Sequence, residues 1–408
     1  MPEPAPLPFW PLLAAALGLL LPWGVAFIAA EDGDAARPGL MALIASLLAL
    51  LGMAATGFAL AFGGVGIPID HPDLAMLVWE WTPLREGHLA WWGVAGWMGF
   101  GMHGAQTPLA AWLFLATLPG VAVASVLVMI PLWRRISPLA GVIMAGWTAF
   151  VLAPLVLNWT QAGGWLMHLG ESLGAGEGFI DAGGASLFLL PAGVALAALF
   201  LPRREGEEGE SLWNALGAGL LLIGGMAWIA ASPLALWTRL TPMEAVLNAL
   251  LAAAAGGLIG LTYGWVIQRV PSVSWTARSA AAGFVAMLAG LQLVNALQAM
   301  LVGAIAAWIA ILTAYLIHDL LGREDAGGVF SGLGLPALWG VLAVGFFAPT
   351  PGQMRAQIIG GISILLMGFL SMLLIQLPLA VFRARRMQGG GAVPVATATT
   401  PAEDVDVN

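Results

Sequence analysis

The chain has 408 residues, of which 60% are hydrophobic and only 9% are charged, and its mean hydropathy is +0.92. Roughly 25% of the residues of a soluble domain are charged, so this composition excludes a water-soluble fold. The chain has no cysteine, which excludes disulfides, thiolate metal sites and cysteine nucleophiles. Its net charge of −8 argues against a nucleic-acid partner, because such a partner requires clustered basic residues.

Long apolar runs recur from the N-terminus to near the C-terminus. About 20 apolar residues cross a hydrocarbon layer of about 30 Å, and eleven runs of this kind predict an all-α polytopic membrane protein. The first run is predicted to be a retained span, because the N-terminus has no basic segment and carries Glu3. The predicted spans are 9–29, 39–62, 107–132, 138–157, 182–201, 212–231, 242–267, 276–293, 295–320, 329–348 and 354–382.

Two further segments are predicted to lie outside these spans. The apolar stretch 88–104 is too short and too rich in glycine to count as a span. Residues 389–408 are rich in Gly, Ala, Thr and Pro and end acidic, which predicts a disordered tail. A single transmembrane domain, residues 1–388, is therefore expected to precede this tail.

Arginine supplies all 14 basic residues and predicts the orientation of the chain. With the N-terminus outside, the inside segments hold far more arginine than the outside segments, as the positive-inside rule requires. This predicts a multi-pass protein of the cytoplasmic membrane with its C-terminus inside. The inside residues are Arg37, Arg134, Arg135, Arg203, Arg204, Arg269, Arg278, Arg323, Arg383, Arg385 and Arg386, and the outside residues are Arg85, Arg239 and Arg355.

A four-residue motif occurs twice and indicates an internal repeat. Asp181-Ala-Gly-Gly opens the fifth predicted span, and Asp325-Ala-Gly-Gly opens the tenth. Because the two copies lie five spans apart, they enter the membrane from opposite faces. This predicts two inverted five-helix repeats, about 9–201 and 212–348, followed by the last helix 354–382, with a shared site near the midplane.

The same segments resemble the ammonium transporter and Rhesus family. The end of the second span, Gly57-Phe-Ala-Leu-Ala-Phe-Gly63, is similar to the family's Gly-x-Ser-Leu-Ala-Phe-Gly. Trp159-Thr-Gln-Ala-Gly-Gly-Trp-Leu-Met-His-Leu-Gly170 resembles its tryptophan-rich and glycine-rich motif, and Phe179-Ile-Asp-Ala-Gly-Gly184 resembles its Asp-Phe-Ala-Gly-Gly element. The run from Glu324 to Phe347 resembles the segment that bears the family's second signature histidine. The resemblance implies eleven helices in two inverted halves, one pore in each protomer, and a homotrimer.

The resemblance also implies a pore in which two histidines face each other, and this sequence departs from that pattern. The second histidine position falls on Leu333, and the first falls on Leu189 or Phe188, depending on the alignment of the repeated motif. The vestibule tryptophan position falls on Gln161, the hydroxyl position is retained as Ser232, and Trp228 is the implied gate aromatic. No counterpart of the third-span aromatic is found near residues 118–120. Asp181 and Asp325 are implied to keep a structural, helix-capping role.

Two interpretations of function remain open. In the first, the protein is an ammonium transporter-like channel that passes neutral ammonia or another small gas. In the second, Phe188, Leu189 and Leu333 close the pore, and the protein is a transport-inactive structural or regulatory subunit of a larger membrane complex. The sequence shows no Ser-His-Asp set and no paired carboxylates, so we expect no enzymatic activity, no cofactor and no metal.

The segment 88–104 offers a possible ligand or partner contact at Trp92, Trp97 and His103. An aromatic surface of low charge suits another membrane subunit or a bound hydrophobic ligand, and His103 is a conceivable pigment or haem ligand. The simpler alternative is an interfacial belt of tryptophans packed on the lipid bilayer. Gly256 and Gly260, four residues apart in the seventh span, form a small-residue face that would support homotrimerisation.

Overall fold

The computed structural model describes residues 9–30, 36–83, 92–201, 212–232 and 241–389. The chain separates into two units, residues 1–372 and 373–408. The first unit is the helical bundle described below. The second contributes the C-terminal part of the last helix, and the predicted tail beyond residue 389 lies outside the described residues.

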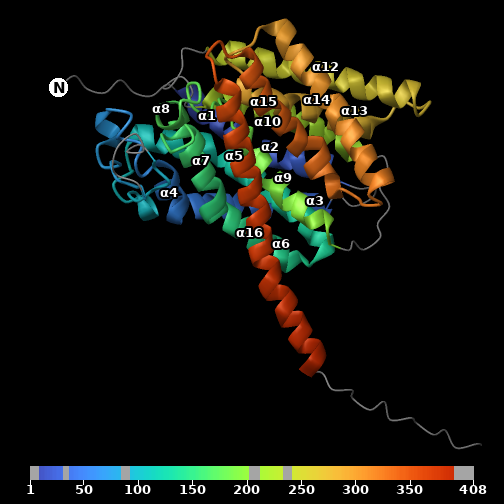
Figure 1. Cartoon of the computed structure of the whole chain (residues 1–408), viewed down its shortest axis with the longest axis horizontal. Coiled ribbons are helices and arrows are strands. Elements are labelled where there is room, and N and C mark those ends of the chain that lie inside the picture. Colours follow the sequence, from blue (N-terminus) through green and yellow to red (C-terminus); the bar gives the residue numbers. More distant parts are fainter. Residues whose placement is uncertain (1–8, 31–35, 84–91, 202–211, 233–240, 390–408) are drawn as a thin grey trace, which may run out of the picture. The chain divides into compact units, whose positions relative to one another are not determined.

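Figure 1 shows the helices in chain order. The first half contains α1 (Phe9–Gly18), α2 (Leu21–Ile28), α3 (Ala36–Gly52), α4 (Phe58–Phe62), α5 (Pro108–Arg135), α6 (Pro138–Trp147), α7 (Ala153–Gln161), α8 (Leu169–Leu173) and α9 (Ser186–Leu199). The second contains α10 (Leu212–Ala231), α12 (Pro242–Val266), α13 (Val273–Met287), α14 (Ala296–Tyr315), α15 (Leu335–Phe347) and α16 (Gln353–Gly389). Single π-helical turns join α3 to α4 (Met53–Gly57) and α6 to α7 (Thr148–Leu152), so each pair is one continuous crossing.

The crossings agree with the predicted spans. In the described residues, eight helical stretches are long and apolar enough to cross a membrane, and Leu12–Ile28 and Ser186–Leu199 are shorter apolar helices. The α13 helix, which carries Arg278, lies in the remaining predicted span, and together these give eleven long helical segments in the described residues. Residues 92–107 form a loop rather than a span.

Residues at the helix ends explain where several helices begin. Thr107 and Ser137 precede Pro108 and Pro138, and their hydroxyls accept hydrogen bonds from the amides of Ala110 (3.4 Å) and Ala140 (3.1 Å). A capping box opens α14, in which Asn295 and Gln298 each accept a hydrogen bond from the other's backbone amide. Each side-chain cap accepts from an orphan amide of the first turn, and Pro108 and Pro138 have no amide to satisfy, so these starts are encoded locally.

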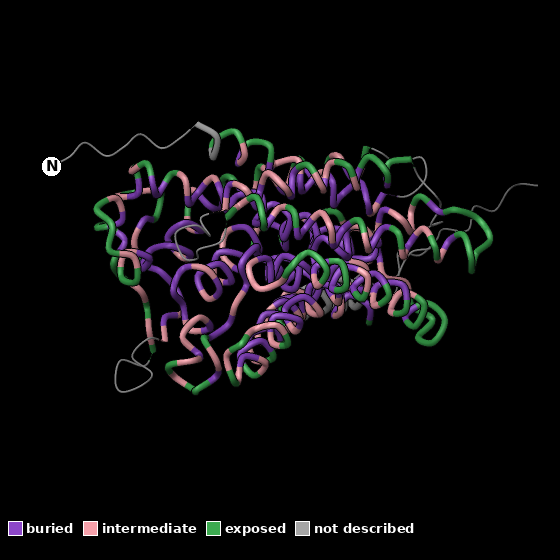
Figure 2. The backbone as a smooth tube through the Cα atoms, turned by 90° about the horizontal axis from the view of Figure 1, so that it is seen from above, coloured by how far each residue is buried: buried purple, intermediate pink, exposed green. Residues whose placement is uncertain are grey.

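The α5 helix lies at the centre of the bundle and α16 lies at its edge. Within the apolar window of α5, 94% of the residues are buried, against 33% for α16. Both helices are strongly apolar, because a helix face in a membrane meets either protein or lipid, so burial and not hydropathy separates the centre from the edge. Figure 2 shows the same arrangement, with buried backbone in the middle of the bundle and exposed backbone around it.

The helix ends gather on two faces. The hairpin face carries residues 63–83, 92–107, 162–185 and 349–352, and it includes a short antiparallel pair, β1 (Glu80–Trp81) and β2 (Ala95–Gly96). The arginine face carries residues 134–137, 267–272 and 321–325. Contacts tie each face together: the Trp165 amide donates to the Gly93 carbonyl on the first, and the Arg135 guanidinium donates to the Glu324 carbonyl on the second.

The small-residue face of α12, at Gly256 and Gly260, was expected to support contact between protomers. It packs within the chain instead. A Cβ atom on Gly260 would lie 2.5 Å from the Trp275 carbonyl oxygen, and one on Gly256 would overlap the Ser279 carbonyl. Both glycines therefore let α13 of the same chain approach α12 closely. They are used within one protomer and give no support to trimerisation.

Candidate functional site

The aspartates of the two copies of the repeated motif each cap the helical segment that follows, at opposite faces. The Asp181 carboxylate accepts hydrogen bonds from the amides of Ala185 (2.7 Å) and Ser186 (2.9 Å), which open α9. The Asp325 carboxylate accepts hydrogen bonds from the amides of Phe330 (3.3 Å) and Ser331 (2.6 Å), which open the helical segment leading into α15. Each carboxylate satisfies two orphan amides of the helix that follows it.

The segment that leads into Asp181 has no regular secondary structure and is held by side chains of α16. Gln353 accepts a hydrogen bond from the Glu177 amide (3.0 Å) and donates one to the Gly178 carbonyl (2.6 Å). One turn later, Gln357 accepts from the Ile180 amide (3.1 Å) and donates to the Ile180 carbonyl (2.9 Å). Both glutamines are buried, and they supply hydrogen-bond partners to backbone groups that have none in regular secondary structure.

The other side of the same segment lies against the end of α13. The Ala182 amide donates to the Ala289 carbonyl (3.1 Å), and the Gly183 amide donates to the Leu288 carbonyl (2.8 Å). Regular α-helix ends at Met287 and continues as a short 3-10 turn, Leu288–Gly290, which frees these carbonyls for the segment before α9. The irregular segment and the 3-10 turn thus satisfy each other inside the bundle, as the membrane interior requires.

Several segments pack closely around Trp228 of α10, and this packed place is named the constriction. A Cβ atom on Gly120 of α5 would lie 2.7 Å from Trp228 Cζ2, and one on Gly184 would lie 2.9 Å from Trp228 Cη2. The indole therefore fills the space between α5 and the start of α9, and its side chain is 5% exposed. Gln161, at the end of α7, reaches the same point, because its Nε2 would lie 3.4 Å from a Cβ atom on Gly184.

Leu187 completes the constriction, although the sequence did not single it out. Its Cδ1 would lie 2.5 Å from a Cβ on Gly120, so it faces α5 beside Trp228. No local pattern in the sequence indicates it, because Gly184 lies before α9 with a positive φ and helical spacing does not apply there. Gly120 also explains why no third-span aromatic was found, since a glycine occupies the place where Trp228 meets α5.

The two signature positions of the resembled family are buried and apolar here. Phe188 and Leu189 are 0% exposed, and Leu333 is 4% exposed. Leu189 Cδ2 would lie 3.9 Å from a Cβ on Gly361, beside side chains of α15, so this residue faces α15 and α16 rather than Trp228. Ser232 follows Trp228 by one turn, and its amide donates to the Ile229 carbonyl (3.1 Å).

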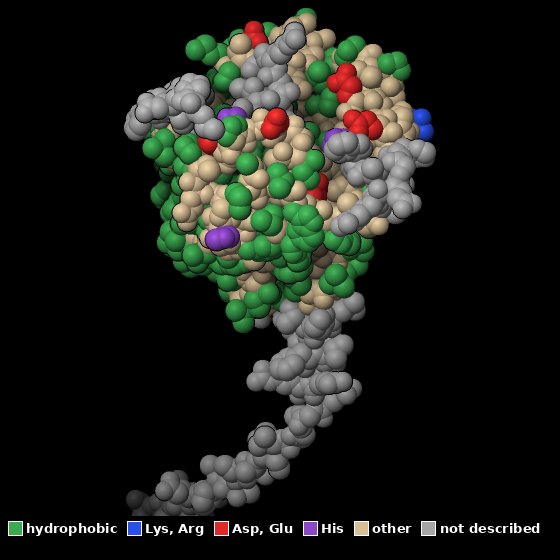
Figure 3. Space-filling view, turned by 90° about the vertical axis from the view of Figure 1, so that its left-hand side faces the viewer, with side chains coloured by type: hydrophobic (Ala, Val, Ile, Leu, Met, Phe, Trp, Pro, Cys, Tyr) green, Lys and Arg blue, Asp and Glu red, His purple; other side chains and the backbone are tan. Residues whose placement is uncertain are grey.

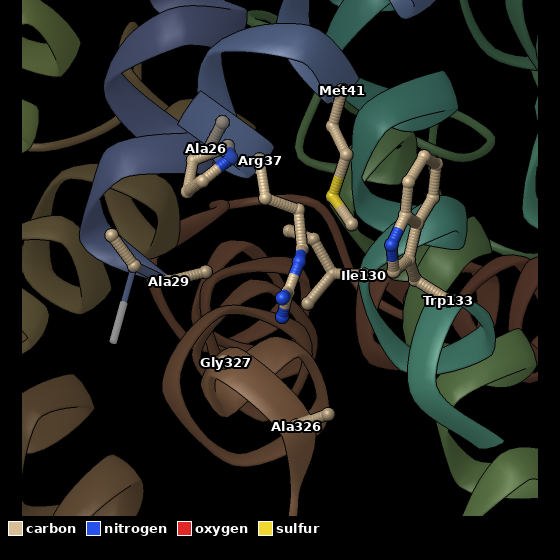
Figure 4. A pocket seen from close by; sticks show the side chains of 10 residues that line it. Ala26, Ala29, Arg37, Met41, Ile130, Trp133, Ala326 and Gly327 are labelled. Atoms are coloured by element: carbon tan, nitrogen blue, oxygen red, sulfur yellow. The ribbon is translucent and has the colours of Figure 1, made fainter. Parts of the chain in front are cut away.

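A cavity of about 470 Å³ opens on the arginine face below the second motif. Ser331, two residues before Leu333, lines it together with Arg278, Arg323 and Glu324. A second cavity of about 40 Å³, large enough for a few waters, lies nearby between α2, α3 and α5. Figure 4 shows Arg37 extending into it beside Ile130, toward the turn at Ala326 and Gly327.

The aromatic residues of the segment 92–104 do not converge on one site. Trp92 stacks on Trp165, with ring centroids 4.9 Å apart, whereas Trp97 lies edge-on to Trp79 (5.9 Å) and Phe100 (5.5 Å). His103 is exposed, and its amide donates to the Phe100 carbonyl (3.1 Å). Among the described residues, no group of three His, Cys, Asp or Glu side chains is placed to hold a metal ion.

The Ammonium Transporter Family model matches residues 9–384 of the chain. The chain belongs to the ammonium transporter family. A Synechocystis sp. relative is 30% identical over 298 residues, which make up 69% of this chain and 66% of the relative. The ammonium transporter Amt2 of Archaeoglobus fulgidus is 28% identical over 276 residues, 63% of this chain and 58% of that protein. The aligned part thus spans less than two thirds of the length of each relative.

Solved structures show the same fold. Candida albicans Mep2 is 19% identical with a TM-score of 0.69, covering 90% of this chain and 83% of that one. A structure titled "Sensor Amt Protein" is 18% identical with a TM-score of 0.71, covering 96% and 98%. Membership of this family of transporters, together with the apolar crossings, makes the chain a multi-pass membrane protein.

Proposed function

We propose that this ammonium transporter family member conducts ammonia, as the neutral molecule, through the constriction at Trp228. The observation that carries the proposal is the chemistry of that point. Trp228, Gln161, Leu187, Gly120 and Gly184 contribute an indole, an amide, an alkyl group and backbone, and none of them titrates. The signature positions Phe188, Leu189 and Leu333 likewise offer no group that can carry a proton.

The cost of desolvation favours the passage of ammonia over that of the ammonium ion. An isolated ammonium ion in a dry, apolar passage faces a desolvation cost on the order of tens of kcal/mol by Born reasoning. Neutral ammonia gives up only hydrogen bonds, which the Gln161 amide and nearby backbone carbonyls replace. We infer the substrate class from the relatives, because the Archaeoglobus fulgidus protein is named an ammonium transporter.

The proposal includes an orientation and an assembly. The arginine face carries Arg37, Arg135, Arg269, Arg278 and Arg323 at the ends of described helices, whereas Arg355 lies at the hairpin face. The positive-inside rule therefore favours an arginine face in the cytoplasm, an N-terminus outside and a C-terminus inside. Family membership supports a homotrimer within the lipid bilayer of the cytoplasmic membrane.

The test compares charge movement with alkalinisation in proteoliposomes. An ammonium jump should give no current above that of empty liposomes, while stopped-flow alkalinisation of the lumen should be accelerated. Trp228→Ala opens the constriction and should accelerate it further. Trp213→Ala, the same substitution at the other end of α10, is the matched control and should match the wild type.

Two results would contradict the proposal. A saturable current would show that a cation crosses without the signature histidines. Alkalinisation no faster than in empty liposomes, for both the wild type and Trp228→Ala, would favour a structural or regulatory subunit of a larger membrane complex.

A further inference from the structure

The cavity of about 470 Å³ on the arginine face, named here the arginine-face cavity, lies among the ends of three helices. Tyr263 belongs to the last turn of α12, and Tyr315 ends α14. Trp275 and Arg278 belong to the first turns of α13. The volume falls within the range of about 300–1,000 Å³ that takes a small ligand. None of the residues described at the constriction lines this cavity, so the proposed path does not account for it.

Aromatic side chains form a wall of the arginine-face cavity. The rings of Tyr263 and Trp275 lie edge-on with their centroids 5.2 Å apart, so α12 and α13 fix this wall together. Tyr315 is exposed, and Leu312 and Trp308, which lie one and two turns deeper on the same side of α14, are exposed as well. Tyrosine and tryptophan favour the headgroup level of a bilayer. The cavity therefore lies at that level, and an apolar track leads from it toward the membrane interior.

Charged groups of both signs line the arginine-face cavity. Arg278 and the exposed Arg323 bring two guanidinium groups. The Asp325 carboxylate accepts its hydrogen bonds from the helical segment that it caps, and the half-buried Glu324 is the second acid. A guanidinium has five N–H donors and a carboxylate accepts several hydrogen bonds, so these groups can bind a ligand in addition to their partners in the protein.

This lining favours a ligand that carries a negative and a positive group together. Guanidinium groups bind phosphate oxygens through charge-assisted hydrogen bonds. The Glu324 carboxylate repels a purely anionic ligand but accepts hydrogen bonds from a primary ammonium group. A phosphoethanolamine headgroup carries both groups, joined by a short ethylene link. A choline headgroup carries the same charges but has no N–H to donate.

The two ends of the bundle differ in charge, which favours a phosphate group at the arginine face. Figure 3 looks onto the end where α4 and α8 lie, and acidic side chains outnumber basic ones on its surface. The arginine face instead carries Arg135, Arg269, Arg278 and Arg323. Basic pockets between membrane helices suit phospholipid headgroups, because the phosphate is negatively charged.

We propose that the arginine-face cavity binds the headgroup of an ethanolamine-type phospholipid from the leaflet at this face. Arg278 and Arg323 bind the phosphate, and Glu324 accepts hydrogen bonds from the ammonium group. The acyl chains follow Leu312 and Trp308 into the membrane. The inference goes beyond the proposed function, since it holds whatever crosses the constriction. A bound lipid connects α12, α13 and α14 to the loop before the second motif and therefore stabilises the folded chain.

The test compares short-chain lipids on the delipidated protein in mild detergent, with thermal unfolding followed by tryptophan fluorescence. Dioctanoyl phosphatidylethanolamine should raise the unfolding midpoint saturably. Dioctanoyl phosphatidylcholine has no N–H, and dioctanoyl phosphatidylglycerol has no ammonium group. The half-saturating concentration should be at least about tenfold higher for each of these two, because a hydrogen bond to a charged group is lost. O-phosphoethanolamine, the headgroup without chains, distinguishes a soluble ligand from a lipid and should give no saturable rise over the same range.

Variants separate the two halves of the site. Arg323→Gln should raise the half-saturating concentration of phosphatidylethanolamine at least about tenfold. Arg355→Gln, the same substitution at an exposed arginine of the hairpin face, is the matched control and should behave as the wild type. Glu324→Gln should remove only the selectivity, so that the ethanolamine and choline lipids bind alike and phosphatidylglycerol binds more tightly than to the wild type.

A wild type that binds the three lipids alike would overturn the inference, and so would unchanged binding in Arg323→Gln. Saturation by O-phosphoethanolamine at the same concentration as by the lipid would show a soluble ligand, which overturns the assignment to a phospholipid. If either variant does not fold, the comparison of the three lipids on the wild type decides by itself.

Discussion

Replacing Gln357 by leucine should destabilise the bundle through a single backbone position. Gln357 is 0% exposed and makes two hydrogen bonds to Ile180, one to the amide at 3.1 Å and one to the carbonyl at 2.9 Å. Leucine has a similar volume but can make neither bond, so both backbone groups of Ile180 lose their partner. This irregular segment then loses its Gln357 partner on the side of α16, directly before the Asp181 cap.

The magnitude follows from the two orphaned groups. A buried donor or acceptor without a partner costs about 1–3 kcal/mol, which gives about 2–6 kcal/mol for the pair. Ile180 is only partly buried, so water can reach its backbone, and we expect the lower part of that range, about 2–4 kcal/mol. Gln353→Leu should have a comparable effect, and the double variant should lose less than the sum, because both glutamines hold one segment.

Equilibrium unfolding of the purified protein in mixed micelles, driven by a denaturing detergent and followed by circular dichroism, measures this loss. Gln268→Leu is the matched control, since Gln268 is exposed and the same substitution there should change the free energy of unfolding by less than about 0.5 kcal/mol. A Gln357→Leu variant as stable as this control would refute the reasoning, because it would show that the segment before Asp181 is held by other contacts.

Further predictions concern pH, the two caps, orientation and assembly. Because burial raises the pKa of Glu80 from 4.5 to about 7, the folded chain holds a proton that the unfolded chain releases, so stability should fall by up to about 3 kcal/mol as the pH rises through this window. The same unfolding assay should show a flatter profile for Glu80→Gln, and an equally steep profile would contradict the assignment. Asp181→Ala and Asp325→Ala should each cost about 1–2 kcal/mol, and a large effect at one with none at the other would argue against equivalent roles. Since the chain has no cysteine, Glu171→Cys should react with an impermeant maleimide in intact cells and Gln268→Cys only after permeabilisation; the reverse would invert the proposed orientation. Native mass spectrometry in mild detergent should show three copies, and a stable monomer would contradict the homotrimer.

The sequence by itself determined the class and the course of the chain. Membrane burial requires about 20 apolar residues for each crossing, so the spans can be read from composition alone. Thr107-Pro108 and Ser137-Pro138 mark helix starts because capping depends on residues within one turn of each other. The repeated Asp-Ala-Gly-Gly motif was visible for the same reason, since each carboxylate bonds amides four to six residues further along the chain.

Only the tertiary structure decided what meets at the constriction. Trp228, Gly120 and Gly184 lie on three separate segments, and nothing local in the sequence shows that the indole of one fills the space above the other two. The same holds for Leu187, which counting along the motif passed over in favour of Phe188 and Leu189. The α12 glycines looked like a surface for another copy, yet they meet α13 of the same chain. Glu80 carried no motif at all, and its position depends on the approach of Asn158 and Gly93 from distant parts of the chain. Contacts of this kind depend on packing between elements, and packing is set by the whole bundle rather than by neighbours in sequence.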